Sequence, residues 1–172
     1  MTSTSRVLAH TKAYWDMLVK KGQFTSIAMG KLVVKSAKPG FVVAEIPVEK
    51  DHENSYGTAH GGWIGSLVDA GGSLAIASHG LPSTGVSTDI NVSYIRAVKP
   101  STMLKMECEC LKLGKTLAST EVRLSCDEGN IVAVGRHTKY VVEAWKHYAK
   151  QQEQQGSSGE EIQSTSFPKS KL

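Results

Sequence analysis

Charged residues are almost absent from one long segment of this 172-residue chain. Between Glu53 and Asp89, Asp69 is the one residue that carries a full charge at neutral pH. Apolar residues and glycines surround it, and a carboxylate in such surroundings is costly unless it is paired, hydrogen-bonded or protonated. Asp69 is therefore a candidate functional residue.

Cysteine is also scarce. The chain has three cysteines, Cys108, Cys110 and Cys126, and no Cys-x-x-Cys pair. This number and spacing give neither a disulfide framework nor a zinc motif. Cys108 and Cys110 lie two residues apart in a strand-like run, so we expect both on one face as small buried side chains. Such cysteine usage fits a reducing or neutral compartment.

Three other signals are missing. The chain has no run of 18 apolar residues, so no membrane span is expected. The net charge of +4 is mild and gives no case for a nucleic-acid partner. His60 has no second His, Cys or acid at ligand spacing, so neither a metal nor another cofactor is expected.

The sequence does contain an alternation of strand-like runs around one apolar helix. We expect that helix at residues 61–78 and an earlier amphipathic helix at residues 6–21. Strands are expected at residues 31–36, 41–48, 85–96, 102–113, 116–125 and 131–142. Runs of strands around one helix indicate an α+β fold with an antiparallel sheet.

The expected central helix has an unusual glycine content. Gly65, Gly71 and Gly72 each cost about 1 kcal/mol of helix propensity relative to alanine. Such a cost predicts that a sheet or a partner helix packs very close to the backbone of this helix.

The C-terminal part differs in composition. Residues 143–155 are expected to form a polar helix, and residues 156–170 are expected to be disordered because they have almost nothing to bury. The printed sequence ends in Ser170, Lys171 and Leu172, a peroxisomal address that an import receptor recognises. We therefore expect that receptor as a partner and the peroxisome as the location.

Two other locations are alternatives. Residues 1–14 contain no acid and weakly resemble a transit peptide, which would direct the protein to the mitochondrion. The amphipathic helix at residues 6–21 is the preferred interpretation of this segment. The cytoplasm is the other alternative.

Several separated motifs together resemble one family. Asn54, Gly57, His60, Gly61 and Gly62, followed by Asp69, form the first motif. The likeness continues through residues 85–94, 111–118 and 135–139, and covers roughly residues 22–140. The set resembles hotdog-fold acyl-CoA thioesterases, of the phenylacetate-pathway type and of the type of thioesterase superfamily member 2.

The resemblance implies a fold and an assembly. Six antiparallel strands would wrap around the central helix, and an N-terminal helix would precede them. The hotdog domain would span residues 30–142, between an N-terminal helix and lead-in (1–29) and a C-terminal extension (143–172). Two subunits would pair into a homodimer with two sites at the interface, and dimers would pair again into a homotetramer.

The resemblance also assigns catalytic roles. The Gly61 N–H would bind the thioester oxyanion, and Gly62 would add to it, because glycine leaves the backbone N–H groups accessible. Asp69 would act as general base or as nucleophile through a mixed anhydride, across the interface on Gly61 of the partner subunit. Both roles of Asp69 remain open.

Three polar residues would complete the catalytic site. Asn54 would orient the thioester carbonyl or the attacking water, although an Asn in a polar loop is usually a turn residue. Ser87 would hydrogen-bond the catalytic acid or its water. His60 would either donate to the thioester or fix the loop.

The substrate would contact two further groups of residues. A basic rim would bind the coenzyme A nucleotide, with side chains from Lys112, Lys115, Arg136, His137 and Lys139, and additional charge from Arg96 and Lys99. The acyl pocket would be lined by Tyr56, Trp63, Ile64 and Leu67. Trp63 is bulky for this family position, so the chain-length preference of relatives does not transfer.

The predicted function is acyl-CoA thioesterase, which hydrolyses fatty acyl-CoA to free fatty acid and CoA. A serine-hydrolase mechanism is disfavoured because no Gly-x-Ser-x-Gly motif occurs. A non-catalytic acyl-CoA sensor and a hotdog dehydratase are the alternatives. The sensor would need a DNA-binding appendage, and the dehydratase would need a different Asp/His pattern.

Overall fold

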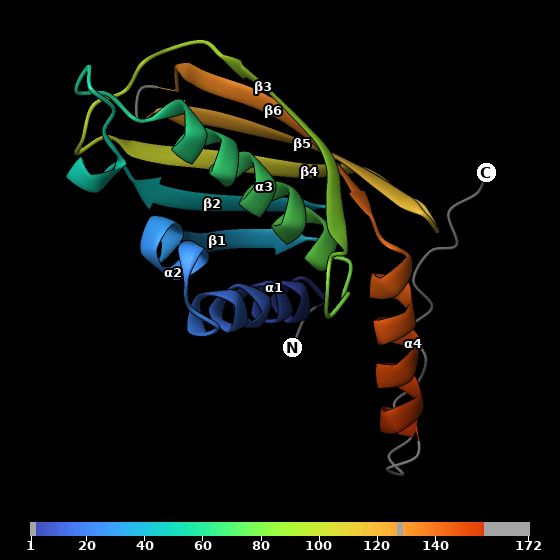
Figure 1. Ribbon diagram of the computed structural model, residues 1–172. Coiled ribbons are helices and arrows are strands. Elements are labelled where there is room, and N and C mark those ends of the chain that lie inside the picture. Colours follow the sequence, from blue (N-terminus) through green and yellow to red (C-terminus); the bar gives the residue numbers. More distant parts are fainter. Residues whose placement is uncertain (1–2, 127–128, 157–172) are drawn as a thin grey trace.

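A six-stranded antiparallel sheet and one helix that crosses its face form the body of the protein (Figure 1). The computed structural model describes residues 3–126 and 129–156. The strands run in the order β1-β2-β4-β5-β6-β3. Their bounds are β1 Val33–Lys38, β2 Phe41–Pro47, β3 Val86–Tyr94, β4 Met103–Leu113, β5 Leu117–Cys126 and β6 Ile131–Tyr140.

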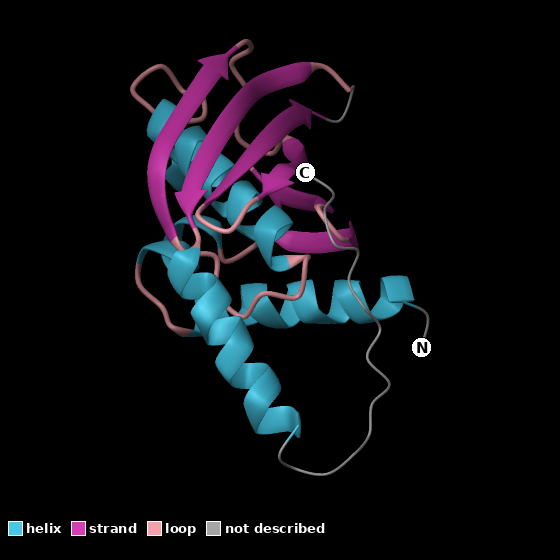
Figure 2. Cartoon of the chain, turned by 90° about the vertical axis from the view of Figure 1, so that its right-hand side faces the viewer, coloured by secondary structure: helices cyan, strands magenta, loops and turns pink. Residues whose placement is uncertain are grey.

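The central helix is α3 (Gly61–Ala77), and the sheet curves around it (Figure 2). Helix α1 (Ser3–Lys20) buries Tyr14 and Trp15 and packs against β1 and α3. The predicted α+β class, the antiparallel sheet and the two helices are confirmed. The sequence did not predict the short helix α2 (Phe24–Met29) or the 3-10 turn at Lys50–His52.

The predicted close approach to α3 is confirmed, and the element that approaches is the sheet. A Cβ atom added at Gly71 would lie 2.8 Å from Cys108 Sγ, and one added at Gly72 would lie 2.6 Å from Thr120 Oγ1. Cys108 is fully buried, while Cys110 is half-buried and packs against the same core. The expected burial is therefore confirmed for Cys108 and only in part for Cys110.

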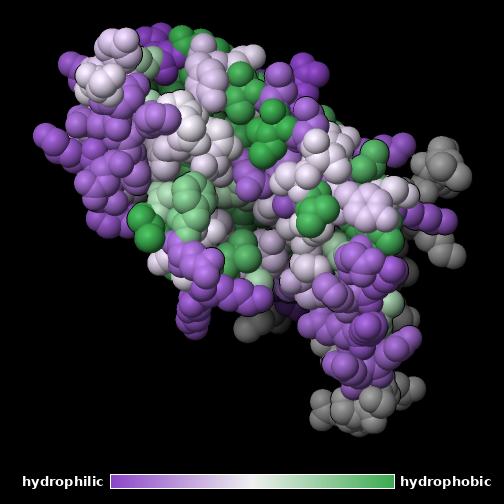
Figure 3. Space-filling view, viewed as in Figure 1, coloured by the Kyte–Doolittle hydropathy of each residue, from purple (hydrophilic) through white to green (hydrophobic). Residues whose placement is uncertain are grey.

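Helix α4 (Val142–Gly156) extends away from the sheet and is mostly hydrophilic (Figure 3). Its first turn is held by Ala144, which is buried, and by Trp145, whose Nε1 donates to the Gly114 carbonyl at 2.9 Å. None of the described helices is long and apolar enough to cross a membrane. The predicted disordered segment and the tripeptide Ser170-Lys171-Leu172 lie outside the described residues.

Strand β3 occupies an edge of the sheet and is largely exposed. Val86, Ile90 and Tyr94 retain 64%, 41% and 60% of their accessible surface. An edge strand with exposed apolar side chains and unpaired backbone groups is a natural surface for pairing with another strand. This edge lies beside the exposed face of α3, where Asp69 is found.

Candidate active site

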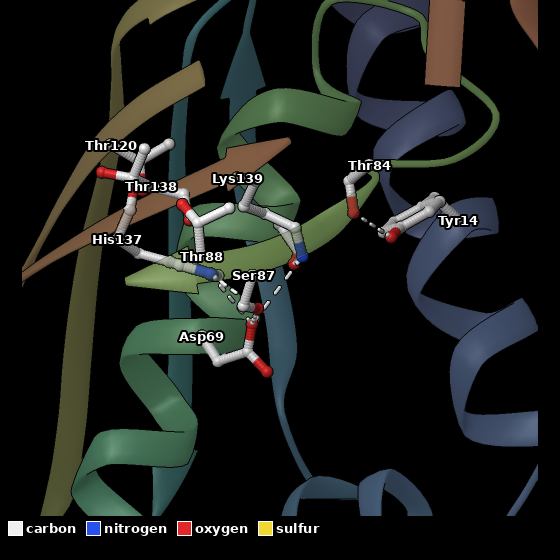
Figure 4. Close-up of polar contacts among 10 residues, drawn as sticks. Tyr14, Asp69, Thr84, Ser87, Thr88, Thr120, His137, Thr138 and Lys139 are labelled. Carbon is white, nitrogen blue, oxygen red and sulfur yellow. Dashed lines mark hydrogen bonds and ion pairs between the residues drawn. The ribbon is translucent and has the colours of Figure 1, made fainter. Parts of the chain in front are cut away.

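Asp69 lies in the middle of α3, and its side chain is 48% exposed. Oδ1 of its carboxylate lies 3.5 Å from Ser87 Oγ, 3.5 Å from His137 Nε2 and 3.8 Å from Lys139 Nζ. Figure 4 shows these three side chains converging on one oxygen while the other points away. Within the described residues, Oδ2 makes no hydrogen bond or ion pair. One oxygen is therefore anchored and the other is available to a reactant.

The expected contact between Ser87 and the acid is present. Ser87 Oγ also lies 2.9 Å from His137 Nε2. A carboxylate can only accept, so the hydroxyl donates to Asp69 and accepts from His137 when the histidine carries its proton on Nε2. That tautomer satisfies both contacts of Ser87. It leaves His137 Nδ1 unprotonated, and this atom has no hydrogen-bond partner among the described residues.

The expectation that His137 and Lys139 belong to an exposed basic rim is wrong. They are 0% and 5% exposed and point toward α3. Successive residues of a strand face opposite sides of a sheet, so Arg136 points outward and is exposed. Lys112 and Lys115 are exposed as well. The five residues of the predicted rim therefore fall into two groups. Lys112, Lys115 and Arg136 are exposed, whereas His137 and Lys139 contact Asp69.

Burial governs the charge state of the two inward-facing residues. It lowers the pKa of His137, and the charge of Lys139 acts in the same direction, while Asp69 opposes both. Burial also lowers the pKa of Lys139, and Asp69 again opposes the shift. His137 is thus favoured as a neutral hydrogen-bond donor, and Asp69 favours the charged form of Lys139 against the effect of burial.

The loop before α3 is organised by its own hydrogen bonds. The backbone N–H groups of Tyr56 and Thr58 donate to Asn54 Oδ1 at 2.9 and 3.3 Å, and Gly57 adopts a φ of 71°. Asn54 is therefore engaged in a turn in the single chain. Its predicted role in catalysis stays a prediction.

His60 caps the start of α3. The Gly62 N–H donates to His60 Nδ1 at 2.9 Å, which supports the role of His60 in fixing the loop and occupies the Gly62 donor. The Gly61 N–H donates to no acceptor in the described part of the chain. Gly61 therefore keeps the free N–H that an oxyanion site needs, and Gly62 does not.

Within one chain, Gly61 and Asp69 are too far apart to act on one carbonyl group. They are separated by eight residues of one helix, which corresponds to a rise of about 12 Å.

A hollow of about 350 Å³ lies between these two points. It is lined by Gly62, Gly65, Ser66, Asp69, Ile90, Val92 and Tyr94. Tyr94 Oη donates to the Gly61 carbonyl at 3.1 Å and so ties the edge strand to the start of α3. Sequence analysis included Tyr94 in a resembling segment but did not propose it as a site residue. The signal was the hydroxyl of a large aromatic side chain at the end of this strand.

The predicted acyl-pocket residues do not line this hollow. Trp63 stacks on His52 with ring centres 4.0 Å apart, and its Nε1 donates to the Ala28 carbonyl at 2.7 Å. Ile64 and Leu67 are core residues, while Tyr56 is 88% exposed. Trp63, Ile64 and Leu67 lie on the side of α3 that faces the core, and their role in an acyl pocket stays a prediction.

Known proteins share both this sequence pattern and this fold. The family model described as "Thioesterase superfamily" matches residues 56–133. Human "Acyl-coenzyme A thioesterase 13" is 40% identical over 114 residues, which are 66% of this chain and 81% of the human protein. This chain belongs to the thioesterase superfamily. The hydrolysis of thioesters expected from its sequence is the activity of that family.

Solved structures of thioesterases support the same conclusion. Zebrafish thioesterase superfamily member 2 superposes with a TM-score of 0.70 and 38% identity, over 77% of this chain and 96% of that chain. A hypothetical thioesterase from Streptococcus pneumoniae, solved with coenzyme A, gives a TM-score of 0.62 and 28% identity over 65% and 89% of the two chains. The predicted hotdog fold is thereby confirmed.

Proposed function

We propose that this thioesterase hydrolyses fatty acyl-CoA to free fatty acid and CoA. The observation that carries the proposal is the Asp69 carboxylate, which is anchored through one oxygen beside a hollow and leaves the other oxygen free. The human relative is named for acyl-coenzyme A, and the Streptococcus pneumoniae structure contains coenzyme A. Both names support CoA thioesters as substrates.

The chemistry needs an oxyanion donor and an activated oxygen. The free Gly61 N–H at the start of α3 would stabilise the negative charge that develops on the thioester oxygen. The free oxygen of Asp69 would take a proton from water or attack the carbonyl carbon directly. A single turnover in ¹⁸O-labelled water distinguishes the routes, because only direct attack places the label first in Asp69.

The assembly we propose is a homodimer built on the edge strand β3, which would continue the sheet into a second copy. It would bring Asp69 of one chain to the Gly61 loop of the other, which one chain alone does not achieve. Pairs of dimers would form a homotetramer. Multi-angle light scattering measures both states.

The test of the function is thiol release from acyl-CoAs of two to eighteen carbons. Asp69→Asn is expected to lower kcat about 10²–10⁴-fold, the usual contribution of a general base. Asp16→Asn, an exposed acid on α1, is the matched control and should keep the rate of the unmodified protein. Equal rates for both variants would contradict the role of Asp69. Tight binding of acyl-CoA without turnover would favour the sensor.

We also propose that the protein acts in peroxisomes, through an import receptor that binds Ser170, Lys171 and Leu172. A fluorescent protein fused to the N-terminus would leave this tripeptide accessible. Punctate fluorescence that becomes diffuse when Leu172 is removed is the expected result. A diffuse or mitochondrial signal from the intact fusion would contradict the location.

A further inference from the structure

Lys139 is a buried lysine, which is rare in proteins. It is 5% exposed, and its ammonium group lies between β6 and α3. Nζ donates to Ser73 Oγ at 2.9 Å and lies 3.8 Å from Asp69 Oδ1. A lysine that is removed from water in this way needs a compensating charge, and Asp69 is the carboxylate within ion-pair distance.

We propose that Lys139 is a positioning residue for hydrolysis. Its ammonium group holds Oδ1 of Asp69 in place, so that the second carboxylate oxygen stays free beside the hollow. This inference rests on the proposed function of Asp69. It assigns Lys139 a place beneath the reacting acid, where sequence analysis had placed it on a rim that binds the nucleotide.

No other described residue supplies the same charge. The ionisable groups around Lys139 and Asp69 are His137 on β6, Tyr14 on α1 and Asp89 on β3. Burial lowers the pKa of His137, so the imidazole is favoured as neutral. Burial raises the pKa of Tyr14, whose hydroxyl pairs with Thr84 at 3.0 Å. Asp89 is negative and cannot stabilise a second carboxylate.

The second contact of Lys139 fixes where the charge sits. Ser73 lies one turn after Asp69 on α3, so one ammonium group reaches two residues on the same side of the helix. Ser73→Ala removes a hydrogen bond and keeps the charge. Lys139→Gln keeps hydrogen-bonding capacity at a similar length and removes the charge. These two variants separate geometry from electrostatics.

The experiment measures kcat and KM separately for Lys139→Met and Lys139→Gln. Loss of the ammonium group should lower kcat by up to about 10²-fold, the effect of a small displacement of a reacting group, and should leave KM unchanged. Ser73→Ala, which keeps the ammonium group, should lose much less. Lys105→Met removes an exposed lysine from β4 and should keep the kcat of the unmodified protein.

An unchanged kcat in Lys139→Gln, or a loss that appears only as a higher KM, would overturn the proposal. Lys139→Gln decides the question if circular dichroism shows that Lys139→Met is unfolded. A crystal structure of Lys139→Gln gives a readout without substrate, and it should show the Asp69 carboxylate turned away from Ser87 and His137. A carboxylate that keeps its position would overturn the proposal even if the protein hydrolyses no acyl-CoA.

Discussion

The two halves of the candidate site are built in different ways. The acid half joins α3, β3 and β6, because Asp69 meets Ser87, His137 and Lys139, and two of these partners are buried. The loop half is organised mainly by local bonds, such as Asn54 N–H to the Thr58 carbonyl at 2.8 Å and Gly62 N–H to His60 Nδ1. Each half is thus prepared separately within the chain, and in the proposed homodimer one site combines the acid half of one copy with the loop half of the other.

The largest expected effect is the recovery of activity when two inactive variants are combined in one dimer. Asp69→Asn damages the acid half, and Gly61→Pro removes the free N–H of the loop half. Proline suits this first helical position, because the preceding His60 has a ψ of 131° that proline favours. Asp69→Asn alone should lose about 10²–10⁴-fold in kcat, and Gly61→Pro alone about 10²–10³-fold. Their co-expressed mixture should recover about a quarter of the activity, because half of the dimers hold one intact site out of two.

The matched control is Gly61→Ala. Its Cβ would lie 3.5 Å from Tyr94 Cε1, an ordinary contact, and the N–H is kept. This variant should retain most of the activity. Absence of recovery in a mixture that contains heterodimers, verified with two affinity tags, would show that each chain carries complete sites.

The second prediction compares two glycines of α3. Gly72 packs against the sheet behind the acid half, and Gly65 lines the hollow. Gly72→Ala would place a Cβ 2.8 Å from His137 Nδ1 and 2.6 Å from Thr120 Oγ1, so the free energy of unfolding should fall by about 1–3 kcal/mol. Gly65→Ala meets nothing closer than Tyr94 Oη at 3.8 Å and should gain up to about 1 kcal/mol from helix propensity. Urea unfolding measures both. Equal changes would contradict the close packing of the acid half.

The smallest expected effect is the contribution of His137 to acid sensitivity. Because burial lowers the pKa of His137 below its ordinary 6.5, the unfolded chain binds the proton first as the pH falls. The free energy of unfolding should therefore decline as the pH falls below about 6.5, and less steeply in His137→Gln. The pKa values of His52 and His79 are lowered as well. These two histidines contribute the same pH dependence of the unfolding free energy to the unmodified protein and to His137→Gln. Identical slopes would contradict a neutral His137.

The strands and α3 could be predicted from the sequence, because the apolar pattern of each element extends over many residues. It was not sufficient for α2, which has only six residues, begins after Gln23 at a φ of 66° and has no side-chain cap. The contact of Ser87 with Asp69 followed from the motif. The inward direction of His137 and Lys139 could not be predicted in this way. Alternation along the strand puts these two residues on the face opposite Arg136, but it does not say which face meets α3.

The three glycines inside α3 bear on the order in which the protein folds. A helix with Gly65, Gly71 and Gly72 has little tendency to form alone, and it reaches its full contact only against side chains of β4, β5 and β6. Those strands follow α3 in the chain, so the helix must wait for segments that are synthesised later. We expect the β4–β5–β6 meander to form first and α3 to consolidate last. The Asp69 carboxylate would then become anchored only when folding is nearly complete.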